Sequence, residues 1–167
     1  MRGFADRRLF VVMLILAALV VALDQATKIY VFEVLLVDRP EIVVLPVFSL
    51  VLRLNTGISF SFLSHLPSWV FAALALAVTV GMLIWLARTE RRLPAIGLAL
   101  IIGGALGNAV DRVRLGAVRD FLLVHWPYGD WPFANLAFNL ADAGISTGVV
   151  LLLWDGLFGP RRAAESP

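Results

Sequence analysis

The sequence has 167 residues, of which 60% are hydrophobic and only 16% are charged. A soluble domain of this length is closer to half apolar and a quarter charged, so the composition excludes an ordinary soluble protein and indicates a membrane protein. The formal net charge is +2, and the basic residues are scattered at the ends of apolar segments, whereas a nucleic-acid-binding protein gathers them in a patch. The chain has no cysteine, which excludes disulfides, thiolate metal sites and a cysteine nucleophile. We expect a single integral membrane domain over residues 1–167.

The first apolar segment follows a basic start. Fifteen apolar residues run from Leu9 to Leu23, directly after Arg7 and Arg8. A secretory signal peptide has this form, but here the polar sequence DQATK follows the apolar core instead of a small-residue cleavage site. We therefore expect a retained first transmembrane helix at about 9–27. Asp24 and Lys28 are spaced to form an acid-before-base ion pair on its surface, which we interpret as a structural polar pair.

The next region, about 30–66, has a different pattern. Proline occurs at positions 40 and 46, and β-branched residues alternate with others from Glu41 to Phe62. Period-two alternation predicts strands, and Asn55-Thr56-Gly57 is a turn signal. Because a sheet edge needs hydrogen-bond partners that hydrocarbon lacks, we expect a small extracytoplasmic β-sheet outside the membrane core.

Three further apolar segments complete the chain, at about 68–88, 95–113 and 138–158. Each is close to the roughly 20 residues that a helix needs to cross a bilayer core of about 30 Å. The predicted fold class is therefore a mainly α membrane protein, a four-transmembrane-helix bundle with a small β-sheet.

The distribution of basic residues predicts the orientation. Eight of the fourteen lie at the amino terminus, in the loop after the second span and at the carboxyl terminus. With four spans these places share one side, and the positive-inside rule puts them in the cytoplasm. The β region and four carboxylates would then lie on the outer side: Asp24, Asp111, Asp120 and Asp142.

Two of these carboxylates are candidates for catalysis. A carboxylate loses hydration at the edge of hydrocarbon, so an ionisable residue there is interpreted as functional by default. We expect Asp120 and Asp142 to meet across two helix ends. Two carboxyl groups within about 3 Å share one proton, so one can accept a proton from water while the other donates to a carbonyl oxygen. Two alternatives stay open: separate aspartates that are hydrated or paired with Arg112 and Arg119, and a pair in which Asp111 is the acid.

Three asparagines lie at the same predicted level as these carboxylates. Asn55, Asn108 and Asn139 could hydrogen-bond between helices, which would make them packing groups. They could equally hold the backbone of an extended peptide that has no water to bond there. Asp111 and Arg112, at the end of a span, favour structural ion pairs with neighbours. Gly103 and Gly107 have the GxxxG spacing of close helix packing.

Five blocks in fixed order resemble a known family. The blocks are DQATK from Asp24, NTGISF from Asn55, GGALGNAVDR from Gly103, VRDF from Val118 and FNLAD from Phe138. Together with four apolar spans they are similar to lipoprotein signal peptidase, also called signal peptidase II. The resemblance implies an aspartic endopeptidase of the bacterial inner membrane, multi-pass, with both termini cytoplasmic and the active site toward the outer face. It would remove the signal peptide from prolipoproteins, cutting before a diacylglyceryl-modified cysteine.

The resemblance also implies roles for individual residues. The aspartates of VRDF and FNLAD, Asp120 and Asp142, would be the catalytic pair, and Asp24 and Lys28 would be stabilising. Substrate-binding or site-supporting roles would belong to Asn55, Gly57, Asn108, Asp111, Arg112, Asn139 and Ala141. We expect no metal and no cofactor. The expected partners are a lipidated prolipoprotein and membrane lipid, with no nucleic acid, and the enzyme would act as a monomer.

A different class of function would predict a different distribution of carboxylates. A small membrane transporter or proton-relay protein would place them along a path through both leaflets, whereas here they gather on one side and Asp155 is the only acid near the inner end of the last span. A scaffold subunit that binds a partner through the β region would tolerate the loss of any single aspartate.

Overall fold

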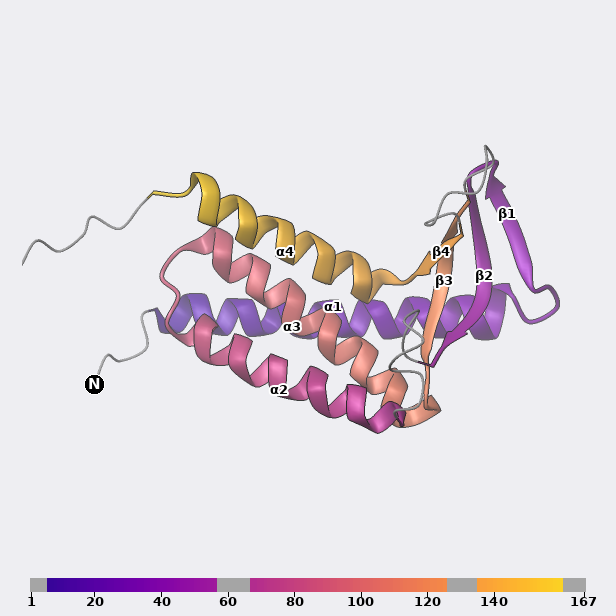
Figure 1. Ribbon diagram of the computed structural model, residues 1–167, viewed down its shortest axis with the longest axis horizontal. Helices are drawn as coiled ribbons and strands as arrows, with labels where there is room; N and C mark the ends of the chain where they lie inside the picture. Colours follow the sequence, from indigo (N-terminus) through magenta and orange to yellow (C-terminus); the bar gives the residue numbers. More distant parts are fainter. Residues whose placement is uncertain (1–5, 57–66, 126–134, 161–167) are drawn as a thin grey trace, which may run out of the picture.

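The structure is a computed structural model that describes residues 6–56, 67–125 and 135–160. Four long helices form a bundle, and each is long and apolar enough to cross a membrane (Figure 1). This confirms the predicted class of four-helix membrane protein. The helices are α1 (Arg7–Tyr30), α2 (Ser68–Ala87), α3 (Arg92–Leu115) and α4 (Leu140–Phe158).

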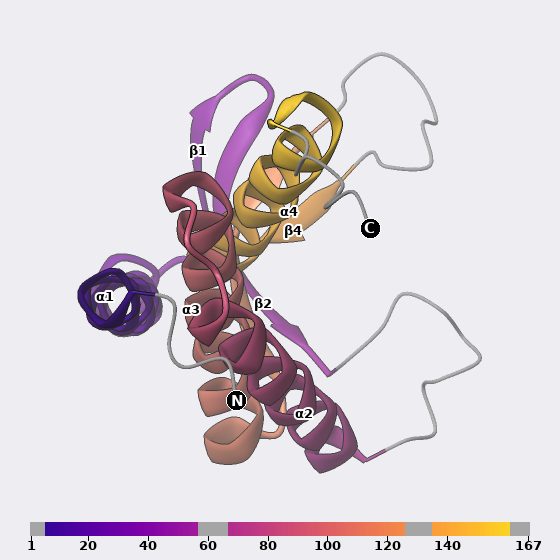
Figure 2. The same cartoon turned by 90° about the vertical axis from the view of Figure 1, so that its left-hand side faces the viewer.

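Helix α3 is the centre of the bundle and contacts the other three (Figure 2). Its most apolar stretch is 61% buried, whereas the corresponding stretches of the other helices are 17% buried or less. Three helices therefore turn most of their apolar surface outward, as a lipid environment requires.

Small residues allow the backbones of α3 and its neighbours to approach closely. A Cβ atom on Gly97 would lie 2.9 Å from the carbonyl oxygen of Gly148 on α4, and one on Gly104 would collide with the carbonyl oxygen of Ala141. A Cβ on Gly103 would lie 2.6 Å from the side chain of Val20 on α1. Close packing of this kind replaces the hydrophobic driving force that is absent between helices in lipid, and it presses the first turn of α4 against α3.

A four-stranded antiparallel sheet lies at one end of the bundle, as Figure 1 shows. The first two strands form a hairpin whose register closes at Leu45 and Phe48, and Arg53 on the second strand lies opposite Asp120 on the third. The strand order follows the chain: β1 (Glu41–Leu45), β2 (Phe48–Asn55), β3 (Val118–Val124) and β4 (Leu136–Phe138).

Two expectations about this end of the chain are wrong. Residues Val31–Leu35 are a π-helix that continues α1, not the start of the β region: the Leu36 N–H bonds to the Val31 carbonyl five residues earlier, and both residues belong to a small apolar cluster with Phe121. Asp120 lies on a strand, not at a helix end. Helix α3 stops at Leu115 because Gly116 adopts a left-handed conformation, φ 72°, and its N–H bonds to the carbonyl of Arg112. Residues 57–62 of the predicted alternating run lie outside the described residues.

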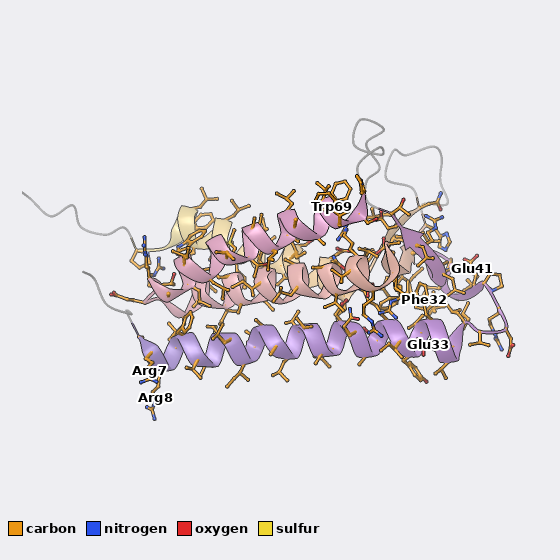
Figure 3. The ribbon with its side chains drawn as sticks, turned by 90° about the horizontal axis from the view of Figure 1, so that it is seen from below. Arg7, Arg8, Phe32, Glu33, Glu41 and Trp69 are labelled. Carbon is orange, nitrogen blue, oxygen red and sulfur yellow. The ribbon has the colours of Figure 1, made fainter. Side chains whose placement is uncertain are left out.

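The two ends of the bundle differ in the residues they present. Figure 3 shows Arg7 and Arg8 at one end of α1, and Phe32 and Glu33 at the other end beside the sheet. Trp69, at the start of α2, also lies at the sheet end. The free basic start of the chain and the sheet are therefore separated by the length of the bundle.

Candidate functional site

Asp142 lies in the first turn of α4, where the sequence NLAD forms a capping box. The Asn139 side-chain oxygen accepts from the Asp142 N–H at 3.0 Å, and the Asn139 N–H donates to Asp142 Oδ2 at 3.2 Å. This reciprocal pattern satisfies two backbone donors at the helix start. Asn108 of α3 donates its side-chain N–H to Asp142 Oδ1 at 2.8 Å. The Asp142 carboxylate is therefore fixed by its own helix and by α3.

Asp120 is held from β3 by neutral amides. It is only 3% exposed, and it accepts side-chain hydrogen bonds from Asn139 at 2.8 Å and from Asn55 at 3.0 Å. Burial raises the pKa of the Asp120 carboxyl, and the charge of Asp142 raises it further, while the hydrogen bonds from Asn55 and Asn139 and the charge of Lys28 oppose this shift. The pKa remains above its usual range, so this carboxyl keeps its proton to a higher pH than an exposed aspartate does.

Asn139 joins the two carboxyl groups. Its Nδ2 donates to the Asp120 carboxyl and, at 3.1 Å, to the Asn108 oxygen, while its backbone N–H donates to the Asp142 carboxyl. The structure therefore brings together a strand residue and a helix-start residue that are distant in sequence. Asp142 is half-buried whereas Asp120 is buried, so Asp142 is the more exposed member of the pair.

The expected Asp24 and Lys28 pair forms, and it belongs to a larger buried cluster. Lys28 Nζ lies 2.8 Å from Asp24 Oδ2 and 3.2 Å from Asp111 Oδ2, and all three side chains are fully buried. Lys28 also donates to the Asn108 oxygen at 2.9 Å. Asp24 Oδ1 in turn accepts from the Ala141 N–H at 3.0 Å. This cluster ties α1 to α3 and to the first turn of α4, directly beside the carboxyl pair.

Two members of this cluster were not identified as site residues from the sequence. Arg119 pairs with Asp111, with Nη2 2.8 Å from Oδ1, and Gln25 donates to the same oxygen at 3.1 Å. The alternative in which Arg119 neutralises Asp120 or Asp142 is therefore wrong. Gln25 lies inside the DQATK block and Arg119 directly precedes Asp120, so their positions in these motifs could have indicated a role in the site. Their hydrogen-bond partners could not be inferred in the same way, because those partners are distant in sequence.

The remaining predicted site residues surround the pair in different ways. Arg112 is close enough to Asp120 and Asp142 to interact with their charges, but within the described chain it forms no ion pair, and its Nε is buried without a hydrogen-bond partner. The Arg112 guanidinium carbon lies 6.0 Å from the centre of the Phe71 ring. Gly57 lies outside the described residues.

A polar cavity of about 520 Å³ opens beside Asp120, between β2 and the start of β4. Its walls include Arg53, Asn55 and Asn135, and Arg53 donates to the Asn135 carbonyl at 3.2 Å. A molecule in this cavity would contact Asp120 from the side of the sheet.

A serine–histidine contact in the sheet does not form a nucleophilic site. Ser49 Oγ lies 2.6 Å from His125 Nε2, but the Glu41 carboxylate approaches that same nitrogen at 3.6 Å. In a catalytic triad the acid binds the other ring nitrogen, and Ser49 is fully buried. In the part of the chain that the structure describes, no group of three metal-ligating side chains occurs either.

Known proteins resemble this chain over most of its length. Residues 16–158 match the family model described as Signal peptidase (SPase) II. A lipoprotein signal peptidase of Pseudomonas fluorescens (strain Pf0-1) is 46% identical over 157 residues, covering 90% of this chain and 89% of that protein. A lipoprotein signal peptidase of Pseudomonas aeruginosa is 43% identical over 157 residues and 90% of both chains.

Solved structures show the same fold. A bacterial membrane enzyme determined by the in meso method at 2.3 Å has a TM-score of 0.72 and 25% sequence identity, covering 92% of this chain and 94% of that chain. The family match covers more than half of the chain, and the relatives exceed two-fifths identity. The chain therefore belongs to the signal peptidase II family, a family of membrane peptidases of the aspartic type.

Proposed function

We propose that this protein is an intramembrane aspartyl endopeptidase that removes the signal peptide from prolipoproteins by cutting before a diacylglyceryl-modified cysteine. The observation that carries the proposal is that one residue, Asn139, binds both carboxyl groups: its Nδ2 donates to Asp120 Oδ1, and its backbone N–H donates to Asp142 Oδ2. The relatives named lipoprotein signal peptidase support the substrate class.

In the proposed reaction Asp120 is the acid and Asp142 is the base. The raised pKa of Asp120 keeps its proton available for the oxygen of the scissile carbonyl. Asp142 takes a proton from water, and the water oxygen bonds to the carbonyl carbon. When the carbon–nitrogen bond then breaks, Asp142 gives its proton to the departing amine, and a hydroxyl of the intermediate returns a proton to Asp120. The pair ends in its starting state, with one water consumed.

The rival acid, Asp111, is less suited to this chemistry. Its carboxylate already accepts from Lys28, Gln25 and Arg119, whereas among the described residues no cation forms an ion pair with Asp120. Asp111 is also fully buried. We therefore assign it a supporting role.

The substrate's lipid reduces what the protein must bind. A diacylglyceryl group and an apolar signal peptide remain in the bilayer, against the outward-facing apolar surfaces of the helices, so the protein needs to position only the scissile segment. We assign that segment to the polar cavity beside Asp120, where Asn55 lies in the wall and can donate to the peptide backbone.

The proposed location is the bacterial inner membrane, with both termini in the cytoplasm and the carboxyl pair toward the outer face. Arg7 and Arg8 lie at the end opposite the sheet (Figure 3), as does the loop between α2 and α3 (Figure 1). The positive-inside rule places basic residues of such segments in the cytoplasm. Two basic residues at the sheet end, Lys28 and Arg119, are buried in ion pairs. We further infer that residues 1–167 act as one domain and as a monomer, because one chain supplies both carboxyl groups.

Cleavage of a diacylated precursor by the purified protein in liposomes tests the proposal. Asp120→Asn and Asp142→Asn should each lower the rate by about a hundredfold to ten-thousandfold, because each removes a proton-transfer group. Asp38→Asn, which changes an exposed aspartate in the loop before β1, is the matched control and should retain the wild-type rate. Asp111→Asn should show a partial loss with lower stability. Full activity in either variant of the pair would refute the proposed mechanism.

A further inference from the structure

Arg119 makes more contacts with the buried cluster than its position beside Asp120 suggests. Its backbone N–H donates to Asp111 Oδ2 at 2.9 Å, and its Nη2 donates to Asp111 Oδ1 at 2.8 Å. The same Nη2 donates to the side-chain oxygen of Gln25 at 3.1 Å. The residue is only 6% exposed. One arginine of β3 is therefore bonded both to α3 and to α1.

Arg119, Gln25 and Asp111 form a ring of hydrogen bonds in which each side chain contacts the other two. Gln25 donates to Asp111 Oδ1 at 3.1 Å and to the Gly107 carbonyl at 3.0 Å, while its oxygen accepts from Arg119. The planar guanidinium suits a carboxylate in this way, whereas a lysine ammonium could make only a point contact. Both atoms of the Asp111 carboxylate and both ends of the Gln25 amide are occupied, so the start of β3 has one defined position relative to the two helices.

The same arginine balances the charge of the cluster. Asp24 and Asp111 are two buried anions, and Lys28 contacts both of them. Arg119 supplies the second buried cation. Without it, one negative charge would be left uncompensated next to the pair of carboxyl groups, in surroundings where charge is poorly screened.

We propose that Arg119 is a positioning residue for the reaction, which fixes the strand carrying Asp120 by binding Asp111 and Gln25 simultaneously. The inference rests on the proposed function, because it assigns Arg119 a part in that chemistry. Asp120 directly follows Arg119 in β3, and its carboxyl accepts from the side chain of Asn139 at 2.8 Å, the residue whose backbone N–H binds the Asp142 carboxyl. A displacement of about 1 Å can lower a rate a hundredfold. The bonds from Arg119 to Asp111 and Gln25 therefore control the rate through the position of the Asp120 carboxyl, one residue later in the strand.

The test compares two substitutions of Arg119 in the liposome assay with the diacylated precursor. Arg119→Met keeps most of the length of the side chain but removes its charge and the guanidinium N–H donors that bind Asp111 and Gln25. It should lower kcat about a hundredfold with little change in KM. Arg119→Lys keeps the charge without the forked contact, and its kcat should lie between those of Arg119→Met and the wild type. Arg114→Met is the matched control, because Arg114 is an exposed arginine of the same end and should keep wild-type kcat.

The pH profile of kcat separates positioning from general stabilisation. In the proposed reaction kcat falls at high pH, on the alkaline limb of the profile, because Asp120 loses its proton there. Arg119→Met leaves a negative charge in the cluster, which favours the protonated form of Asp120, so this alkaline limb should move to higher pH. Arg119→Lys should leave that limb in place. The double variant Arg119→Met/Asp111→Asn removes one charge of each sign, so its limb should return while its kcat stays low. The charged groups near Arg119 and Asp120 that set this profile are Asp24, Lys28, Arg53, Asp111, Arg112 and Asp142.

The outcomes distinguish this inference from the proposed function. Wild-type kcat and an unmoved alkaline limb in Arg119→Met, in a series where Asp120→Asn is inactive, would overturn the role of Arg119 and leave the carboxyl pair intact. If Arg119→Met does not fold, wild-type kcat in the folded Arg119→Lys protein would overturn it equally. An active Asp120→Asn would overturn the mechanism and the role of Arg119 together.

Discussion

Two buried carboxylates near the sheet end of the bundle, Asp111 and Asp120, have opposite surroundings. Asp111 binds two cations, Lys28 and Arg119, and it joins α1, α3 and β3. Asp120 binds the amides of Asn55 and Asn139. Both side chains are withdrawn from water to almost the same extent.

The difference shows how a single site can use one carboxylate to hold the structure together and a second carboxylate for proton transfer. When a carboxylate lies between cations, ion pairs compensate for its loss of hydration. It then holds neighbouring elements together, and removing it destabilises the fold strongly. A carboxylate among neutral amides has its geometry fixed without a counter-charge, so burial can raise its pKa and keep its proton available. The structural role of Asp111 and the catalytic role of Asp120 therefore differ because of the groups that bind each carboxyl, cations or amides, more than because of burial.

The largest expected effect concerns the structural carboxylate. Asp111→Asn should lower the free energy of unfolding by about 3–5 kcal/mol, because Lys28 and Arg119 lose their common counter-charge in a buried site. Asp120→Asn, a substitution of the same shape, removes no ion pair and should change stability much less. Unfolding of both variants in the same detergent by denaturant titration checks this, and equal losses would contradict the distinction.

The second effect concerns the side-chain amide of Asn139, which donates to Asp120 and accepts from the backbone N–H of Asp142. Asn139→Leu should lower kcat about a hundredfold to a thousandfold, since it removes a preorganised donor to Asp120. It should also cost about 1 kcal/mol in stability, because Asn139 caps α4. Asn139→Ser is the matched variant: serine also caps a helix well, so stability should return while the rate stays low. If serine restored the rate as well, the assignment of the Asn139 Nδ2 as a necessary donor to Asp120 would be wrong.

A smaller effect is expected at the other amide of Asp120. Asn55→Ala should lower kcat about tenfold, the value of one hydrogen bond of about 1.4 kcal/mol. The hydrogen bond from Asn55 lowers the pKa of Asp120, so its removal should raise that pKa and move the alkaline limb of the rate to higher pH. A pH–rate profile measures both changes, and a limb that moved to lower pH would contradict this account of Asp120.

The smallest effect is a dependence of stability on pH. The folded-state pKa of Asp120 is raised, mainly by burial, so the folded protein holds this proton more tightly than the unfolded chain does. The corresponding stabilisation is present in full below the unfolded-state pKa and is lost as pH rises through the folded-state pKa. The melting temperature of Asp120→Asn should therefore rise relative to that of the wild type over this interval. A constant difference across the interval would show that the Asp120 pKa is not raised.

The sequence predicted the four helices and the presence of strands after the first one, because long apolar segments and alternating β-branched residues are local signals. It did not predict the first hairpin, because the turn signal at Asn55 follows β2, whereas the chain reverses between Leu45 and Phe48. It did not predict β3. The first four residues of that strand, Val118 to Phe121, are all buried, so they lack the alternation of a half-exposed strand, and they pair with β2 far away in sequence.

The candidate site was predicted in part. Asp120 and Asp142 could be named from the VRDF and FNLAD blocks, and the structure joins both to Asn139. Which carboxylate Arg119 binds could not be deduced, because Asp111, Asp120 and Asp142 were all possible partners before the turn at Gly116 was known. Gln25 gave no signal beyond its place in a polar block, since its role arises from contacts across the bundle.

The capping box of α4 has a consequence for biosynthesis. Asn139 and Asp142 lie at the start of α4, which leaves the ribosome after the other three helices, and Asp24 of α1 binds the Ala141 N–H within that same turn. If the pair performs the proposed chemistry, a nascent chain with three inserted helices has no hydrolytic centre at all. Insertion of the fourth helix would then complete the pair and switch the enzyme on.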